Sequence, residues 1–238
     1  MICDLTWLAT CLDLRLALTC VLNCLDLDSA GYGVSEEVLS IAAMLQIGAS
    51  IFYRPKERAV HADTARQNFH KPGGDHVTLL NVWNQWAQTQ YSTQWCFENF
   101  IQVRSLKKAR DIREQIEGMM ERVELEVLSN PDAHDAIAKS VTAGFFYHTA
   151  KLQKTLDYRT IKHPQTVHIH PTSSLHGTQP RWVVYHELVL TTKEFMRQII
   201  EIKNEWLVEI APHYYKKKDV EDDAGKKLPK AVGRASGA

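Results

Sequence analysis

Apolar residues recur every three or four positions through most of residues 35–142, and this spacing predicts a bundle of amphipathic helices. The period is clearest just after a Pro-Gly-Gly turn, where one helical face collects Val77, Leu80, Trp83 and Ala87. A longer amphipathic run begins near Val103 and is predicted to end near Leu128, before an Asn-Pro-Asp turn. A last short helix is predicted at residues 133–142.

Four predicted helices have a residue near their start that can cap free backbone N–H groups. Asp75 follows the Pro-Gly-Gly turn, and Ser35 and Ser92 precede two other helical runs. Asn204 stands in the same position before a short run near the end of the chain. Each side-chain oxygen is expected to accept a hydrogen bond from the first turn of its own helix.

After Gly144 the apolar period shortens to about two residues, which predicts strands. The β-branched and aromatic runs lie at residues 158–161, 166–170, 182–191 and 195–202. Four or five short strands predict a small antiparallel barrel. The OB-fold, a five-stranded barrel that often binds oligonucleotides, fits this pattern. From Lys216 onward the chain is charged with almost no apolar residues, and we expect it to be disordered.

These patterns together predict an α+β chain with helices first and a barrel second. The expected segments are a divergent N-terminal segment (1–28), a helical bundle (29–143), a five-stranded OB-fold barrel (144–212) and a disordered basic tail (213–238). Asp4, Asp13 and Arg15 interrupt the apolar residues of the first segment. That segment is therefore predicted to be neither a signal peptide nor a membrane span.

Composition limits the chemistry that the chain can perform. Lys plus Arg and Asp plus Glu each number 28, so the formal net charge is zero and nucleic-acid binding would need local clusters of cations. The five cysteines include Cys20 and Cys24, but no further Cys or His pair completes the spacing of a zinc site. From its cysteines we expect an intracellular protein in a reducing environment. Cys96 lies between Trp95 and Phe97 and is predicted to be a buried structural thiol.

Catalytic motifs are missing from the sequence. No phosphate-binding G-x-x-x-x-G-K-[ST] loop occurs, nor an Asp-Glu-Ala-His box, a G-x-S-x-G elbow or an H-E-x-x-H pair. We therefore predict no catalytic residue and no ATP hydrolysis by this chain alone. His168 and His170 would share a strand face, but no Cys or carboxylate is placed to complete a metal site, so no metal is predicted.

Two segments of the helical region resemble a known family. Residues 72–86 read PGGDH-x-x-LLNV-x-x-x-W, and residues 95–115 read WC-x-x-NF-x-x-x-R-x-x-x-x-AR-x-x-R-x-Q. This pattern resembles the C-terminal accessory region of DEAH-box RNA helicases, in which a helical ratchet bundle precedes an OB-fold. The resemblance covers roughly residues 29–230. It implies that the region guides single-stranded RNA for an ATP-driven motor that is absent from this chain.

The resemblance also implies a cellular setting. The run APHYYK and the acidic, then lysine-rich residues after it are similar to spliceosomal members of the family. This similarity implies a nuclear protein that acts in pre-mRNA splicing. Its expected partners are pre-mRNA, helicase motor domains, spliceosome proteins and a glycine-rich-patch activator, and no membrane contact is expected. ATP and Mg would belong to the motor. Residues 1–28 depart from the family pattern, so a truncated, alternatively spliced or mispredicted start is expected.

The predicted RNA contacts fall into three groups. Cations near the first strands and short donors on the turn IHPTSS could hold phosphates, and the resemblance implies that this turn faces RNA. Two tyrosines could stack on bases, and two arginines of the long helix match the family pattern. The residues are Lys151, Arg159, Lys162, His170, Thr172, Ser173, Ser174, Tyr147, Tyr158, Arg104 and Arg113, with Lys154 beside the first group.

Each of these residues also has a structural interpretation. The cations could form an ordinary solvated surface, the aromatic rings could fill the barrel, and the helical arginines could pair with nearby acids. Two alternative functions stay open as well. The chain could be a stand-alone module that binds single-stranded RNA without ATP, or a docking scaffold for spliceosome proteins.

Overall fold

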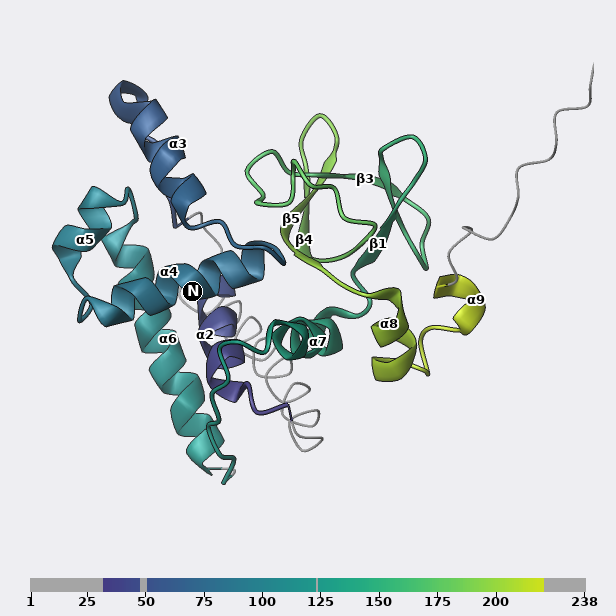
Figure 1. Cartoon of the computed structure of the whole chain (residues 1–238), viewed down its shortest axis with the longest axis horizontal. Helices are drawn as coiled ribbons and strands as arrows, with labels where there is room; N and C mark the ends of the chain where they lie inside the picture. The colour runs from purple at the N-terminus through teal and green to yellow at the C-terminus, as the bar shows by residue number, and fades with distance from the viewer. Residues whose placement is uncertain (1–31, 48–50, 123, 221–238) are drawn as a thin grey trace, which may run out of the picture.

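The computed structural model describes residues 32–47, 51–122 and 124–220, so the predicted segment 1–28 lies outside the described residues. A helical domain comes first, and its elements are α2 (Ser35–Leu45), η1 (Lys56–Arg58), α3 (Ala59–Asn68), α4 (Asp75–Gln88), α5 (Thr93–Glu98), α6 (Val103–Arg122) and α7 (His134–Phe145). A barrel follows, with β1 (Thr149–Leu152), β2 (Tyr158–Thr160), β3 (Thr166–Ile169), β4 (Trp182–Leu190) and β5 (Glu194–Glu201). Two short helices, α8 (Asn204–Ile210) and α9 (Lys217–Val220), come last. The helical domain and the barrel lie side by side, and α7 runs below the barrel (Figure 1).

Helix α2 is the centre of the helical domain. Nearly all of its side chains are buried, and it packs against α4, α6 and α7. The apolar faces predicted for α4 and α6 are buried as expected, including Leu106, Ile112 and Ile116 on α6. Helix α6 ends at Arg122, earlier than predicted, and Glu124 takes a positive φ of 57°. The following segment then runs beside the start of α2, where Leu128 accepts a hydrogen bond from the Glu36 N–H.

The predicted caps divide into one that is confirmed and three that are wrong. Ser92 accepts a hydrogen bond from the Trp95 N–H at 3.3 Å, as predicted. Ser35 instead accepts from the Leu128 N–H at 2.8 Å, and Asn204 donates to the Val220 carbonyl. Helix α4 starts at Asp75 without a side-chain cap, because that carboxylate is bonded elsewhere.

The barrel is closed in the order β1-β2-β3-β5-β4, with antiparallel pairing except between β3 and β5. The four predicted runs all contain strands, and β1 is an additional short strand before them. The interior is filled by alternate side chains such as Val167, Val183 and Met196, each fully buried. The predicted helices followed by a five-stranded barrel are therefore confirmed.

The Pro-Gly-Gly turn joins the two domains. Gly74 forms an antiparallel bridge with Ile200 of β5, and the Gly73 carbonyl accepts from the Glu201 N–H at 2.9 Å. Gly74 has a φ of 128°, and an added Cβ would lie 2.4 Å from the Ile199 carbonyl oxygen. Only glycine fits this close approach. One apolar core runs through the junction, since buried residues of α4, α7, β4 and β5 belong to the same cluster.

The disorder predicted for residues 213–220 is wrong. Helix α9 contains Val220, which is 3% exposed, and the Tyr215 hydroxyl donates to the Phe146 carbonyl at 2.6 Å. Helix α9 therefore packs against α8, and residues 221–238 lie outside the described part of the chain. In the described residues, no helix is both long and apolar enough to cross a membrane.

Candidate nucleic-acid interface

The Asp75 carboxylate fixes the predicted RNA-facing turn to the helical domain. It accepts hydrogen bonds from the Ser173 hydroxyl at 2.7 Å, from the Ser174 N–H and hydroxyl at 2.7 and 2.8 Å, and from the Ile199 N–H at 2.9 Å. Next to Ile199, Gln198 adopts a left-handed conformation with φ 51°. Ser173 and Ser174, predicted to hold phosphate oxygens, thus use these donors to position the turn.

A pocket lies beside this carboxylate, between the helical domain and the barrel. It has a volume of about 80 Å³ and is lined by Arg66 and His70 from the helical domain and by His170, Thr172 and Arg197 from the barrel. We call it the junction pocket. Arg66 donates to the Thr172 carbonyl and lies 5.1 Å from the ring centroid of Phe52.

The junction pocket is lined by two guanidinium groups, those of Arg66 and Arg197, and by two carboxylates, those of Asp75 and Glu187. Burial lowers the pKa of Arg66, and Arg197 lowers it further, against an opposing effect of Asp75. Burial also lowers the pKa of His170, and Arg197 and Arg66 add to that shift. The pKa of His70 is lowered for the same two reasons, burial and Arg66. Both shifts favour the neutral imidazole, so the charged groups that line the pocket are the two arginines and the two carboxylates.

A second hollow lies on the barrel and has a volume of about 480 Å³. Its walls come from β1, the turn at residues 153–157, β2 and the segment before β4, and its cations are Lys151, Lys154, Arg159 and Arg181. We call it the barrel groove. The one carboxylate lining it, Asp157, contacts His168 Nδ1 at 3.2 Å. Strands 2 and 3 and the loop between strands 1 and 2 are the face that OB-folds use for oligonucleotides.

Comparison with protein families agrees with both halves of this architecture. Residues 27–79 match the ratchet-like helicase-associated domain, and residues 137–214 match the oligonucleotide/oligosaccharide-binding (OB) fold. The chain carries a helicase-associated ratchet domain followed by an OB-fold. This pair of domains is typical of the C-terminal region of DEAH-box helicases. The OB-fold match begins inside α7, which the sequence-based boundary at residue 144 had placed in the ratchet.

The other RNA contacts predicted for the OB-fold differ in where the structure places their side chains. Lys151 and Arg159 lie in the barrel groove, whereas Lys162 pairs with Asp219 at 2.7 Å. Tyr147 is 40% exposed and remains a candidate for stacking. The stacking role predicted for Tyr158 is wrong, because the residue is 2% exposed and its hydroxyl donates to the Pro180 carbonyl at 2.6 Å.

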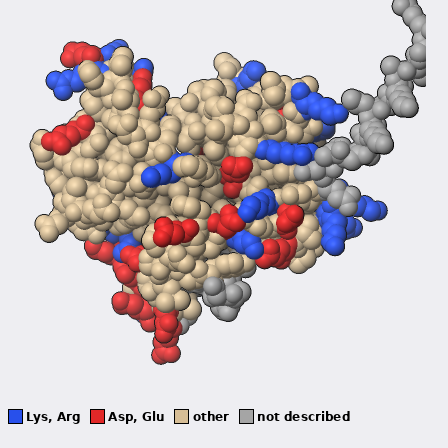
Figure 2. Space-filling view, in the orientation of Figure 1, with Lys and Arg blue, Asp and Glu red and all other residues tan. Residues whose placement is uncertain are grey.

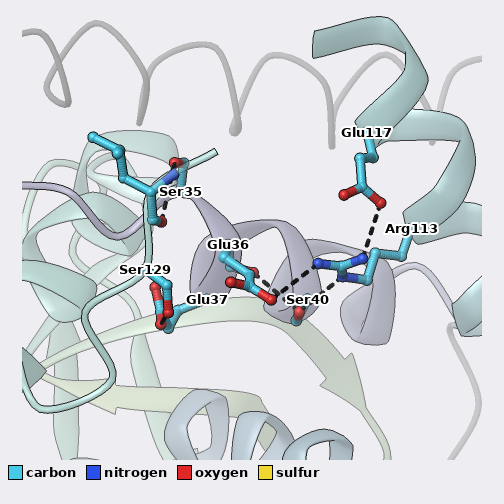
Figure 3. A network of polar contacts seen from close by, with 8 residues as sticks. Ser35, Glu36, Glu37, Ser40, Arg113, Glu117 and Ser129 are labelled. Atoms are coloured by element: carbon cyan, nitrogen blue, oxygen red, sulfur yellow. Dashed lines mark hydrogen bonds and ion pairs between the residues drawn. The ribbon is translucent and has the colours of Figure 1, made fainter. Parts of the chain in front are cut away.

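The two arginines of α6 differ from each other. Arg104 is exposed and has no ion-pair partner among the described residues, so its predicted contact stays a prediction. Arg113 holds α6 against α2 by bonding Ser40 at 3.2 Å and Glu36 at 3.5 Å, and it also pairs with Glu117 of its own helix at 3.0 Å (Figure 3). Its side chain is 15% exposed, so the structure assigns it to helix packing in place of the predicted RNA contact.

Charge is unevenly spread although the chain is neutral overall. Lys and Arg side chains gather on the face of the OB-fold and near α9, whereas acidic side chains gather at the C-terminal end of α6 (Figure 2). An anion approaching the OB-fold side therefore meets a positive surface.

Sequence patterns did not identify Arg66, His70, Arg181 or Arg197, which belong to different elements and meet only in the fold.

Proposed function

We propose that this chain is the RNA-binding accessory region of a DEAH-box RNA helicase of pre-mRNA splicing. The barrel groove carries the proposal, because four cations line it with one carboxylate, which is itself in contact with a histidine. Ammonium and guanidinium groups in such a groove neutralise backbone phosphates with little dependence on base sequence. In this proposal the ratchet and the OB-fold supply the surface that binds RNA, and separate motor domains with ATP and Mg drive its movement.

The test of RNA binding is fluorescence anisotropy with a short labelled oligo-U at several salt concentrations. Each phosphate contact contributes about −0.7 to the slope of log affinity against log salt for a single strand. The double variant Lys154→Gln/Arg159→Gln should bind about tenfold more weakly, with a slope shallower by about 1.4. Arg122→Gln, at the far end of α6, is the matched control and should bind like wild type. No binding at low salt would refute the proposal.

The splicing role is a separate part of the proposal and needs its own test. It rests on the resemblance of the run APHYYK and of the residues after it to spliceosomal members of the family. An antibody against residues 75–150 should precipitate pre-mRNA, spliceosomal small nuclear RNAs and spliceosome proteins from nuclear extract. Precipitation of ribosomal RNA alone would place the chain in a different process.

An immunoblot of the same extract distinguishes the accessory region from a stand-alone RNA-binding module. A band far larger than 27.2 kDa supports the accessory region of a full helicase, and a band near 27.2 kDa supports the module.

A further inference from the structure

Helix α9 engages the side chain of Lys162, which lies in the turn between β2 and β3. The Lys162 Nζ atom donates a hydrogen bond to Asp219 Oδ2 at 2.7 Å, and this bond lowers the pKa of the Asp219 carboxyl. The same ammonium lies 5.4 and 5.5 Å from the ring centroids of Tyr214 and Tyr215. The charge that was predicted to meet an RNA phosphate is therefore already opposite a carboxylate of the chain itself.

The attachment of α9 to the rest of the molecule is small. The helix has four residues, too few to be stable without tertiary contacts. It packs against α8, where Val220 is buried and its carbonyl accepts a hydrogen bond from Asn204 Nδ2 at 3.3 Å. The ion pair of Asp219 with Lys162 adds a link to the barrel. Because so few contacts hold it, α9 can detach while the strands of the barrel stay paired.

Cations lie around this ion pair and attract anions to it. Residues 216–218 are three exposed lysines directly before Asp219, and Lys and Arg side chains gather near α9 (Figure 2). Arg159, which lines the barrel groove, comes three positions before Lys162 in the chain. An anion that binds the OB-fold therefore arrives at a surface where the Lys162 ammonium is engaged by a carboxylate.

The carboxylate of Asp219 is also the first of a group in the sequence. Residues 219–223 read DVEDD, which places four carboxylates in five positions. Carboxylates and phosphates or sulfates compete for the same ammonium groups. A competitor within the same chain acts at a high effective concentration, so a small anion displaces it poorly. A polyanion that engages several cations at once has the same advantage and can displace it.

We propose that α9 is an autoinhibitory element of the OB-fold, in which Asp219 occupies Lys162 and a polyanion must displace it to reach that ammonium. The identity of the polyanion as RNA rests on the proposed function, whereas the displacement depends only on the contacts around Lys162. The expected effect is selectivity, because only an anion that also binds neighbouring cations gains this contact.

The first experiment uses a labelled heparin fragment and fluorescence anisotropy, so that its outcome does not depend on RNA binding. Asp219→Asn should bind heparin about fivefold more tightly than wild type, because it frees the Lys162 ammonium. Asp135→Asn is the matched control, since it removes the same charge and frees Lys203, which follows β5. The control should gain less than about twofold. Equal gains in the two variants would show an effect of net charge alone and would overturn the proposal.

The second experiment asks whether the gain comes through Lys162. Lys162→Met should weaken heparin binding about fivefold in the Asp219→Asn background and less than about twofold in the otherwise wild-type chain, because Asp219 occupies the ammonium there. Losses of equal size in the two backgrounds would mean that Asp219 does not compete for Lys162, and they would refute the autoinhibition.

The third experiment repeats these measurements with oligo-U and separates the inference from the proposed function. Asp219→Asn should bind oligo-U more tightly than wild type, with a slope of log affinity against log salt steeper by about 0.7 for one added phosphate contact. A gain with heparin, together with no oligo-U binding by any of the proteins, would refute RNA binding and leave the autoinhibition standing. Binding of oligo-U by wild type, with no gain for Asp219→Asn on either ligand, would refute the autoinhibition alone.

Discussion

Replacing Asp75 with alanine removes the acceptor of four hydrogen bonds that join the ratchet to the OB-fold. A hydrogen bond to a charged group contributes about 1.5–3 kcal/mol, and the effects of neighbouring bonds are not additive. The N–H groups of Ser174 and Ile199 would also be left without this acceptor in a partly buried place. We expect the free energy of unfolding to fall by about 4 kcal/mol in total.

Urea denaturation followed by tryptophan fluorescence measures this loss, because the chain contains six tryptophans. Asp75→Asn keeps one acceptor oxygen and should lose about half as much stability as Asp75→Ala. Asp111→Ala removes an exposed carboxylate of α6 and should change the free energy of unfolding by no more than about 0.5 kcal/mol. A loss below about 1 kcal/mol for Asp75→Ala would show that the hydrogen bonds contribute little to the junction.

Two further predictions concern the same region. Gly74→Ala should destabilise the protein by more than about 3 kcal/mol, because the new Cβ would meet the backbone of β5 at 2.4 Å; a melting temperature equal to wild type would contradict this. Burial, with a smaller effect of the nearby His186, lowers the pKa of His76 from 6.5 to about 4, so its neutral form is favoured in the folded state. Since the unfolded chain binds the proton more readily, stability should be complete above pH 6.5 and fall by up to about 3 kcal/mol as the pH drops towards 4. Urea denaturation at several pH values checks this, and His76→Gln should flatten the pH dependence; an unchanged slope would contradict it.

Local patterns predicted the elements well. The cap that Ser92 forms was predictable because its partner, Trp95, lies three positions away. The α4 and α6 faces were predictable because their core contacts repeat with the helical period. The strands followed from alternation, and the OB-fold from their number and length.

Long-range partners account for what the sequence did not predict. Ser35 and Asp75 have the right types and positions for caps, but their partners are Leu128, 93 residues away, and Ser174, 99 residues away. Spacing along the chain carries no information on such partners. The junction pocket was missed for the same reason, since Arg66 and Arg197 belong to different domains. Tyr158 was assigned to the surface because an aromatic residue in a strand looks alike in sequence whichever face it occupies.

The pairing of the Pro-Gly-Gly turn with β5 bears on how the chain folds. Residues Ile200 and Glu201 complete their backbone hydrogen bonds with a segment that precedes the OB-fold match. An isolated OB-fold fragment would expose this part of a strand edge, together with the apolar surface shared with α4, and both favour aggregation. The two domains that sequence comparison separates are therefore expected to unfold in a single cooperative transition, with the glycine turn as part of the barrel.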